Sequence, residues 1–237
     1  MEYFKILAFL NLMCHNNLNM TYLDLVKNLV DAGYLRTEHI INAFKNIDRA
    51  NFVPRKFKKE AYVNAPLPIG HGQTISQPLT VAFMLELLAP GPSEKVLDIG
   101  AGSGWQTAIL AEAVGENGTV FAVERIPEIA EFGKKNLSAY SLIERGRVRY
   151  ICADGSLGLS QNAPFDKIIA AAAARALPTA WKEQLRTGGR IVAPLGASIW
   201  LFIKKGENEF EEFEYPGFAF VPLVEGEEKN SRPLEYY

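Results

Sequence analysis

Short apolar runs alternate with longer segments of helical periodicity along the second half of this chain. The apolar runs lie near residues 95–99, 120–124, 148–153, 166–172 and 190–195, and each predicts a buried strand. The segments between them carry apolar residues at helical spacing, so they predict helices. Strands that alternate with helices are typical of a parallel sheet with helices on both faces.

The pattern differs toward the two ends of the chain. Apolar positions of helical period predict helices over 21–32, 37–47 and 78–88. Between them, the proline- and glycine-rich segment 61–77 predicts irregular structure. Residues 199–204 and 209–215 alternate polar and apolar positions around a Gly-Glu-Asn turn, which predicts an antiparallel pair. We therefore expect an α/β fold, a mostly parallel doubly wound sheet with an N-terminal helical elaboration and an antiparallel C-terminal pair.

The composition suits one globular domain. The chain has 237 residues, 48% of them apolar, and its net charge of −2 with scattered basic residues does not point to nucleic acid as the main partner. The densest basic run, which contains Arg55, Lys56, Lys58 and Lys59, is expected to be a solvated loop or helix face. Two cysteines are too few for a disulfide framework, which fits a reducing cytoplasm, and Cys152 in its apolar run is expected in the core.

A glycine-rich loop directly follows the first of the alternating strands, in Lys95-Val-Leu-Asp-Ile-Gly-Ala-Gly-Ser-Gly-Trp105. A strand, a glycine-rich turn and a helix N-terminus form a cradle in which backbone can approach a ligand closely. A dinucleotide fingerprint starting at Gly100 would need its third glycine at position 105, which holds Trp105. Asp98 at the strand tip would repel a pyrophosphate. It suits a ligand with an amino group, such as the methionine end of S-adenosylmethionine (AdoMet).

The next two strands also end in carboxylates. Glu124 lies about 20 residues beyond the last loop glycine, where an acid in nucleotide-binding units accepts both ribose hydroxyls. Asp154, followed by Gly155, ends the third strand and is well placed to accept a hydrogen bond from an adenine amino group. The alternative interpretation is that Asp98, Glu124 and Asp154 only cap helices.

The segment upstream of the glycine loop is the candidate for substrate recognition. It reads Ala65-Pro-Leu-Pro-Ile-Gly-His-Gly-Gln-Thr-Ile-Ser-Gln-Pro78, in which prolines and glycines fix the backbone and uncharged side chains supply hydrogen-bonding groups. Long irregular segments inside a compact domain are disproportionately functional. His71 stands between two glycines and is expected to be a surface or lining residue rather than a catalyst.

With this segment, the chain resembles one family, the protein-L-isoaspartate (D-aspartate) O-methyltransferases. The resemblance is carried by Pro66-Leu-Pro-Ile-Gly70 with Gly72-Gln-Thr-Ile-Ser-Gln-Pro78, by the glycine loop, by Gly188-Gly-Arg-Ile-Val-Ala-Pro-Leu-Gly196 and by Phe220-Val-Pro-Leu223. It covers roughly residues 21–224, and the Gly-Gln-Thr-Ile-Ser-Gln-Pro string is its most specific part. The sequence departs from the family in the alanine run that leads into Arg175 and in the last residues of the chain.

The resemblance implies a Rossmann-like AdoMet-dependent methyltransferase. The enzyme would methylate the free carboxylate of L-isoaspartyl and D-aspartyl residues in damaged proteins and peptides, release S-adenosyl-L-homocysteine, and so start repair through a succinimide. A carboxylate is ionised at neutral pH, so no general base is required. The combined prediction is that AdoMet is bound by Gln73, Thr74, Asp98, Gly100, Gly102, Gly104, Glu124, Asp154 and Gly155. Substrate contacts are predicted for Ile75, Ser76, Val221 and Leu223, with Ser76 at the catalytic position and no metal.

Two other functional classes share parts of this pattern. A small-molecule AdoMet methyltransferase would share everything from Lys95 onward but lack the 66–78 string, and a non-catalytic AdoMet-binding scaffold would be expected to lose Ser76 or the acids. The expected organisation is a single catalytic domain over 20–237, with a helical and substrate-loop region at 20–90 and the AdoMet-binding sheet and C-terminal strands at 91–237.

The first nineteen residues are expected to be an extension outside that domain. Their apolar stretch, 6–14, is too short to span a bilayer. Glu2 before it and His15-Asn-Asn after it do not provide the basic n-region and the small-residue cleavage site of a secretory signal. Met20 is a plausible alternative start. An N-terminal helix or a membrane-associating segment is the alternative for these residues, although no stable membrane association is expected.

Overall fold

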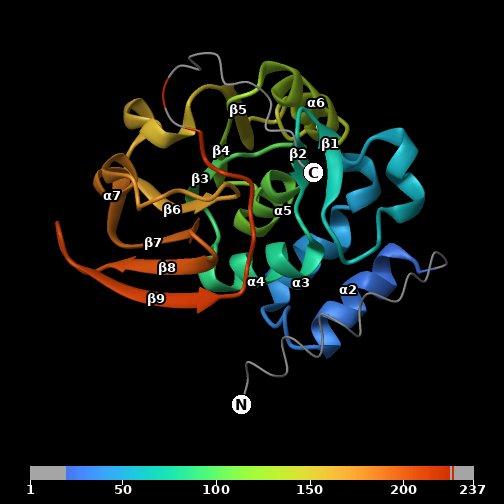
Figure 1. Ribbon diagram of the computed structural model, residues 1–237, viewed down its shortest axis with the longest axis horizontal. Helices are drawn as coiled ribbons and strands as arrows, with labels where there is room; N and C mark the ends of the chain where they lie inside the picture. The colour runs from blue at the N-terminus through green and yellow to red at the C-terminus, as the bar shows by residue number, and fades with distance from the viewer. Residues whose placement is uncertain (1–19, 225, 227–237) are drawn as a thin grey trace, which may run out of the picture.

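A seven-stranded sheet forms the centre of the protein, as the computed structural model shows for the residues it describes, 20–224 and 226 (Figure 1). Its strands stand in the order β5-β4-β3-β6-β7-β8-β9. Their bounds are β3 Lys95–Ile99, β4 Thr119–Glu124, β5 Val148–Cys152, β6 Phe165–Ala170, β7 Leu185–Leu195, β8 Ser198–Lys204 and β9 Phe210–Pro216. The neighbouring strands β5, β4, β3, β6 and β7 pair in parallel, whereas β8 runs antiparallel to both of its neighbours, β7 and β9. The predicted mixed sheet is therefore confirmed.

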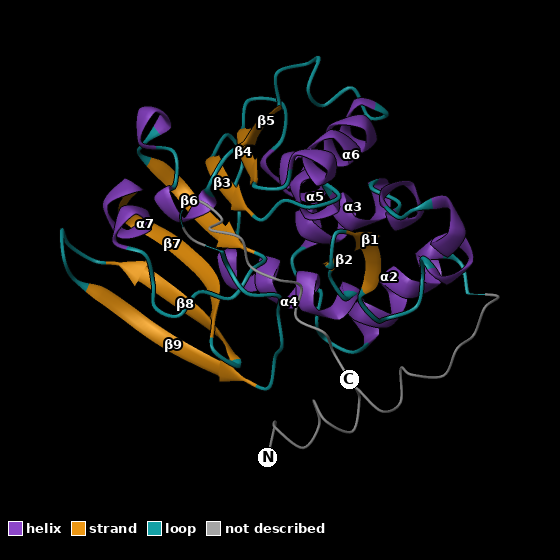
Figure 2. Cartoon of the chain, turned by 45° about the horizontal axis from the view of Figure 1, so that its top comes forward, coloured by secondary structure: helices purple, strands orange, loops and turns teal. Residues whose placement is uncertain are grey.

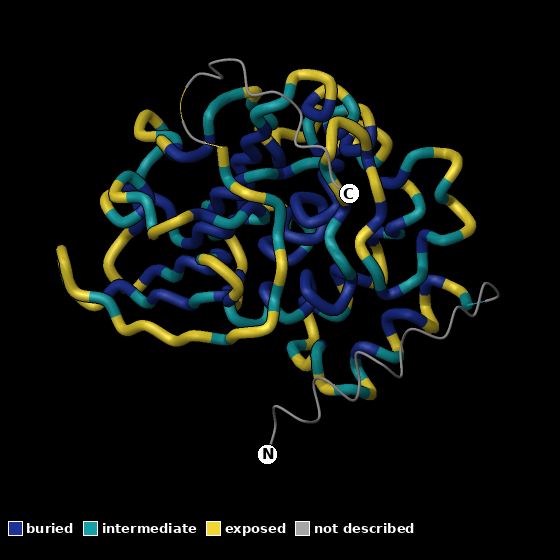
Figure 3. The backbone as a smooth tube through the Cα atoms, viewed as in Figure 1, coloured by how far each residue is buried: buried dark blue, intermediate teal, exposed yellow. Residues whose placement is uncertain are grey.

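Helices cover both faces of the sheet (Figure 2). The described helices are α2 Tyr22–Asp31, α3 Glu38–Asn46, α4 Pro78–Leu88, α5 Trp105–Val114, α6 Pro127–Ser138 and α7 Thr179–Gln184, of which α4 to α7 pack on the sheet. Successive strand residues point to opposite faces, so Val96 packs into the larger core with α3, α4 and α5, while Leu97 packs into a second core that contains Trp181 of α7. The continuous apolar runs of the sequence reflect strands buried on both faces (Figure 3).

The N-terminal helices α2 and α3 lie beside the main sheet. Helix α2 begins with a capping box, because the Thr21 hydroxyl accepts from the backbone of Asp24 and the Asp24 carboxylate accepts from that of Thr21. Helix α3 carries Phe44, which meets Trp105 at the start of α5 edge to face, with ring centroids 5.8 Å apart. The N-terminal elaboration is thereby fixed to the helix that follows the glycine loop.

Segment 61–77 is more regular than the sequence predicts. It contains an antiparallel hairpin of β1 Leu67–Gly70 and β2 Gln73–Ile75, in which Leu67 faces Ile75. Strands of four and three residues, the first of which contains proline and glycine, show too little alternation to be recognised as strands. The hairpin stands apart from the main sheet and beside the N-terminal helices (Figure 2).

Short 3-10 helices fill several of the connections. They are η1 Arg49–Phe52, η2 Arg55–Glu60, η3 Gly155–Leu157 and η4 Ser160–Asn162. Helix η2 carries the basic run and has no buried residue, so the expected solvated face is confirmed.

The expectation that Cys152 lies in the core is wrong. Its thiol is exposed because β5 is the edge strand of the described sheet. Among the described residues, no helix has the length and apolar character needed to cross a membrane.

Candidate functional site

A cavity of about 210 Å³ opens at the carboxyl edge of the parallel strands. Parallel strands bring their carboxyl ends to one edge, so the loops after β3, β4 and β6 meet there. Two other parts of the chain complete the wall, the β1–β2 hairpin and residues 221–224, which we call the rim segment. The cavity thus joins most of the predicted AdoMet residues and the predicted substrate residues in a single space.

The loop after β3 approaches the cavity with its backbone. Gly100 and Gly102 line the cavity, whereas Gly104 lies behind it as the N-cap of α5. Gly104 adopts a φ of 85°, and a Cβ there would come within 3.0 Å of the Leu137 side chain in α6. A glycine is therefore required at this position for α6 to pack against the loop.

Glu124 joins the tips of β3 and β4. Its side chain lines the cavity and is only 7% exposed. One carboxylate oxygen accepts a hydrogen bond from the Gly102 N–H at 3.0 Å, and the other accepts from the Ile126 N–H at 2.9 Å. Each carboxylate oxygen has a second lone pair, so Glu124 can still accept hydroxyl groups from the cavity.

Asp98 lies beneath the loop and does not line the cavity. Its fully buried carboxylate accepts hydrogen bonds from the Gln106 amide at 2.8 Å and from the Thr107 hydroxyl at 2.6 Å. Burial raises the pKa of Asp98 to about 6, against these two hydrogen bonds and with a further increase from the nearby Glu124 charge. Asp98 therefore holds the first turn of α5, and its predicted contact with AdoMet stays a prediction.

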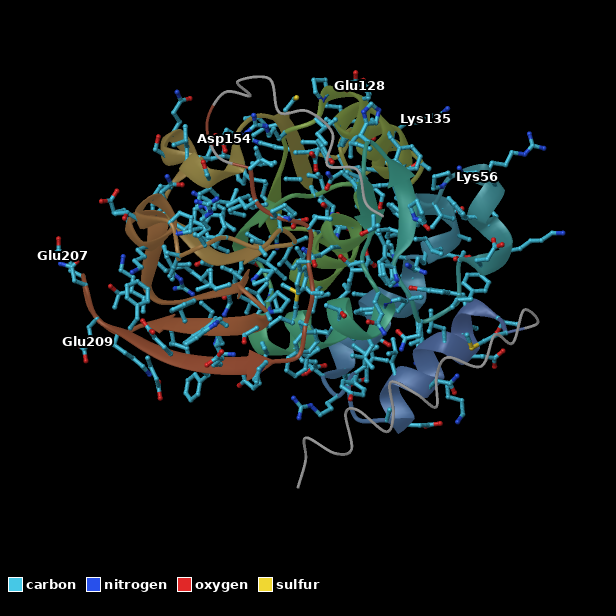
Figure 4. All side chains as sticks on the ribbon, viewed as in Figure 1. Lys56, Glu128, Lys135, Asp154, Glu207 and Glu209 are labelled. Carbon is cyan, nitrogen blue, oxygen red and sulfur yellow. The ribbon has the colours of Figure 1, made fainter. Side chains whose placement is uncertain are left out.

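Asp154 stands at the outer rim, beside the last described residues of the chain (Figure 4). Its carboxylate accepts the Ser156 N–H at 2.9 Å, which caps η3, and the Gly226 N–H at 2.8 Å. Partial burial acts to raise the pKa of Asp154, but the hydrogen bonds from Ser156 and Gly226 lower it overall. Gly155, not Asp154, lines the cavity, and a Cβ on Gly155 would meet Ile99 at 2.5 Å.

The second strand of the hairpin and the residue after it contribute two predicted AdoMet residues, Gln73 and Thr74, and two predicted substrate residues, Ile75 and Ser76. All four line the cavity. The Ile75 side chain is buried, whereas Thr74 is exposed. The Ser76 hydroxyl makes no hydrogen bond with any residue that the structure describes. Its backbone carbonyl, in contrast, accepts from Arg49. The side chain of Ser76 is thus available to a ligand in the cavity. His71 lines the cavity from an exposed turn, as expected.

The rim segment closes the opposite side of the cavity and contains Val221 and Leu223. It pairs with the chain just after β6, because the Ala173 N–H donates to the Val221 carbonyl and the Leu223 N–H donates to the Ala173 carbonyl, both at 2.8 Å. The Arg125 guanidinium, one residue beyond β4, donates to the Val224 carbonyl at 3.0 Å. The substrate side of the site is thereby attached to the cofactor side.

Three structural supports of the site carry no recognisable sequence signal. The Tyr150 hydroxyl, from β5, donates to the Gly102 carbonyl at 2.7 Å. Arg125 holds the rim segment, and the buried Arg49 contacts the hairpin. A lone tyrosine in a strand and arginines next to acids are ordinary in sequence, so only the tertiary contacts distinguish them.

The residues around the cavity fit AdoMet. The glycine loop offers backbone at close range, Glu124 retains acceptor capacity for hydroxyl groups, and the side chains of Val123 and Ile126 provide an apolar wall. Within the described ranges, no group of three or more histidine, cysteine, aspartate or glutamate residues is placed to hold a metal ion. A doubly wound sheet with this loop and acid arrangement at its carboxyl edge defines a Rossmann-like AdoMet-dependent methyltransferase.

Comparison with known proteins identifies the family. Residues 20–228 match the protein-L-isoaspartate(D-aspartate) O-methyltransferase family, PCMT. The chain is 42% identical over 215 residues to the protein-L-isoaspartate O-methyltransferase of Methanopyrus kandleri, covering 88% of this chain and 93% of the relative. It is 44% identical over 200 residues to protein-L-isoaspartate O-methyltransferase 1 of Archaeoglobus fulgidus, covering 84% and 90%. The chain belongs to the protein-L-isoaspartate O-methyltransferase family.

Solved structures agree with the fold. A crystal structure of a protein-L-isoaspartate O-methyltransferase from Plasmodium falciparum, in complex with S-adenosyl-L-homocysteine, superposes with a TM-score of 0.79 at 22% identity, covering 86% of this chain and 99% of that one. A second protein-L-isoaspartate O-methyltransferase structure has the same TM-score at 27% identity, covering 87% and 66%. The sequence-based expectations of family, enzyme class, fold and AdoMet dependence are thus confirmed.

Proposed function

We propose that the cavity holds AdoMet between the glycine loop and the hairpin, with Glu124 accepting the ribose hydroxyls. The position of Glu124 supports this, because it lies on the cavity wall and each of its oxygens accepts a single hydrogen bond from the described residues, which leaves a second lone pair on each. Gln73 and Thr74 would cover the ligand from the hairpin side. Gly155, which lines the cavity and packs closely on Ile99, would lie beside the adenine ring, with Asp154 at its outer edge.

The substrate enters, in this proposal, between the hairpin and the rim segment. Ile75 and Ser76 contact it on one side, and Val221 and Leu223 on the other. The substrate would be a protein or peptide with an L-isoaspartyl or D-aspartyl residue, whose free carboxylate points toward Ser76. S-adenosyl-L-homocysteine and a methyl ester would be the products, and the ester would then close to a succinimide. The free Cys152 thiol and low cysteine content favour the cytoplasm as the place of action.

The residues of this chain act by placing the carboxylate and not by activating it. When bound, AdoMet supplies a methyl group on a positively charged sulfur. The Ser76 hydroxyl would donate a hydrogen bond to the oxygen of the carboxylate that does not attack, which fixes the direction of the other oxygen. The rim segment and the hairpin exclude water around it, and such alignment supplies most of the rate. No proton has to be removed, because the carboxylate is already ionised.

The observation that carries this proposal is the Ser76 hydroxyl, which faces the shared cavity without a protein partner among the described residues. The competing interpretation is a turn-fixing serine before Pro78, whose removal would cost about 0.5–2 kcal/mol of stability. In the structure, the N-cap of α4 is Gln77, and the Leu79 N–H is bound by the Asn64 side chain. That turn is therefore held without the Ser76 hydroxyl.

Replacement of Ser76 by alanine tests the proposal. We expect Ser76→Ala to keep its melting temperature and its AdoMet affinity, while turnover on an isoaspartyl peptide falls about tenfold or more, because small misplacements of a nucleophile are costly. The normal aspartyl peptide serves as the substrate control, and Ser138→Ala, at an exposed position at the end of α6, serves as the matched variant. Full turnover in a folded Ser76→Ala protein would show that Ser76 has no such role.

A further inference from the structure

Arg49 is a fully buried arginine whose hydrogen bonds to the described residues all go to backbone carbonyls. It belongs to η1 and is 0% exposed. One terminal nitrogen donates to the Ala61 carbonyl at 2.7 Å and to the Val63 carbonyl at 3.3 Å. The other donates to the Ala65 carbonyl at 2.9 Å and to the Ser76 carbonyl at 3.1 Å. One side chain therefore holds both ends of the segment that contains the hairpin.

No carboxylate among the described residues balances this charge. Burial lowers the pKa of Arg49 to about 9, partly offset by Tyr22, so the guanidinium remains charged at neutral pH. Four carbonyls replace the counter-charge, and hydrogen bonds from a charged donor are stronger than neutral ones. A planar guanidinium can reach four acceptors in fixed directions, whereas a lysine ammonium has three donors from a single point.

Arg49 also contacts the cofactor side of the site. Its guanidinium lies over the ring of Trp105, 5.3 Å from the centroid, and Trp105 is the first residue of α5, directly after Gly104. The indole N–H of Trp105 in turn donates to the Ile47 carbonyl at 3.2 Å, just before η1. Arg49 is thus in contact with the Ser76 backbone and with the helix that follows the glycine loop.

We propose that Arg49 is a positioning residue for methyl transfer, which holds the Ser76 backbone at a fixed place relative to the glycine loop. This inference rests on the proposed role of Ser76. Arg49 does not line the cavity, so it does not touch substrate or AdoMet. Arg49 acts on the reaction indirectly. It holds the Ser76 carbonyl in place, and the Ser76 hydroxyl orients the carboxylate of the substrate.

Lys204 provides a matched comparison within the same chain. Its ammonium is likewise buried, at 7% exposure, and donates to the Lys182 and Leu185 carbonyls at 2.7 and 2.8 Å. These carbonyls belong to α7 and the start of β7, and Lys204 does not line the cavity. A variant of Lys204 loses a buried cation that binds carbonyls, but it leaves the hairpin and Ser76 in place.

The test uses Arg49→Lys, which keeps the charge, and Arg49→Met, which keeps much of the length without a buried charge. For each we would measure melting temperature, AdoMet affinity, and kcat and KM on an isoaspartyl peptide, at a temperature where the variant is folded. We expect kcat to fall about tenfold or more while the AdoMet dissociation constant and the peptide KM change much less. Lys204→Met is expected to lose stability and to keep kcat.

A double-mutant cycle with Ser76→Ala separates this inference from the proposed function. If Arg49 acts through Ser76, Arg49→Lys should cost much less kcat in the Ser76→Ala background than in the wild type. Losses that simply multiply would overturn the role of Arg49 while leaving that of Ser76 intact. Wild-type kcat in folded Arg49→Lys and Arg49→Met would also overturn it. Full turnover in Ser76→Ala would remove the proposed function and this inference with it.

Discussion

At the scale of single residues, Glu124 combines a structural and a binding task. Its two oxygens accept hydrogen bonds from the N–H groups of Gly102 and Ile126, and its side chain lines the cavity. Glu124→Ala should weaken AdoMet binding by about 1.5–3 kcal/mol, at least about tenfold, because charge-assisted hydrogen bonds to the ribose are lost. Calorimetry on the folded variant measures this. Glu128→Ala, at an exposed acid in the first turn of α6 (Figure 4), is the control and should bind normally. Unchanged affinity in Glu124→Ala would exclude the ribose assignment.

The raised pKa of Asp98 predicts how the free energy of unfolding depends on pH. Its pKa in the folded protein is raised from 3.8 to about 6, mainly by burial, so the folded protein holds a proton in this interval that the unfolded chain has lost. The contribution of Asp98 to the free energy of unfolding is therefore greatest below pH 3.8 and falls as pH rises to about 6. Relative to Asp98→Asn, the wild type should gain on the order of 2 kcal/mol between pH 6 and pH 4, as measured by denaturant titrations. A constant difference between the two proteins would contradict the assigned pKa.

At the scale of elements, the parallel strands could be predicted closely and the hairpin could not. The predicted strand at 95–99 coincides with β3, because a strand buried on both faces is a continuous apolar run that ends at a glycine. The start of β7 at Leu185 was not predicted, since Gly188 and Gly189 suggest a turn where the strand in fact has an irregular register with β6. The strands of the hairpin are too short for a period to show.

The candidate site was predictable in place but not in contacts. Sequence indicates which strand ends carry Asp98, Glu124 and Asp154, because topology sends those ends to one edge. It does not show that Asp98 turns toward α5 while Glu124 faces the cavity, because these directions depend on hydrogen bonds formed only in the folded protein. For Asp154 the helix-capping alternative also holds, since its carboxylate caps η3.

The packing of α6 on the glycine loop predicts that Gly133→Ala lowers stability, whereas helix propensity alone would predict an increase. Gly133 lies inside α6, where alanine is favoured over glycine by about 1 kcal/mol. A Cβ on Gly133, however, would lie 2.6 Å from both the Gly102 carbonyl and the Tyr150 hydroxyl. We expect Gly133→Ala to lower stability by about 1–3 kcal/mol and to weaken AdoMet binding, because α6 must move away from the loop.

Thermal melting and calorimetry measure both effects of Gly133→Ala. Gly206→Ala is the matched control, because its Cβ would meet only Glu209 side-chain atoms at 3.5 Å, an ordinary contact. An increase in melting temperature for Gly133→Ala would mean that helix propensity outweighs the contact with the loop.

At the scale of the whole molecule, we propose that residues 20–237 form the catalytic unit without the first nineteen. Those nineteen residues lie outside the described part of the chain, and the family match begins at residue 20. Helix α2 has its own capping box at Thr21 and Asp24, so a protein that starts at Met20 keeps the cap. We expect it to retain the melting temperature and specific activity of the full chain. A clear drop in either would show that the first nineteen residues contribute to the catalytic domain.

Strand β9 affects how this enzyme interacts with other polypeptides. It is the last strand of the described sheet, with Glu211, Glu212 and Glu214 along it and Pro216 at its end, and most of it is exposed (Figure 3). Glu207 and Glu209 add to the negative charge where the strand begins (Figure 4). Charges and proline on an edge strand oppose pairing with foreign strands. An enzyme of this family acts on damaged proteins, and the carboxylates along β9 would oppose pairing between its own sheet and a strand of such a protein.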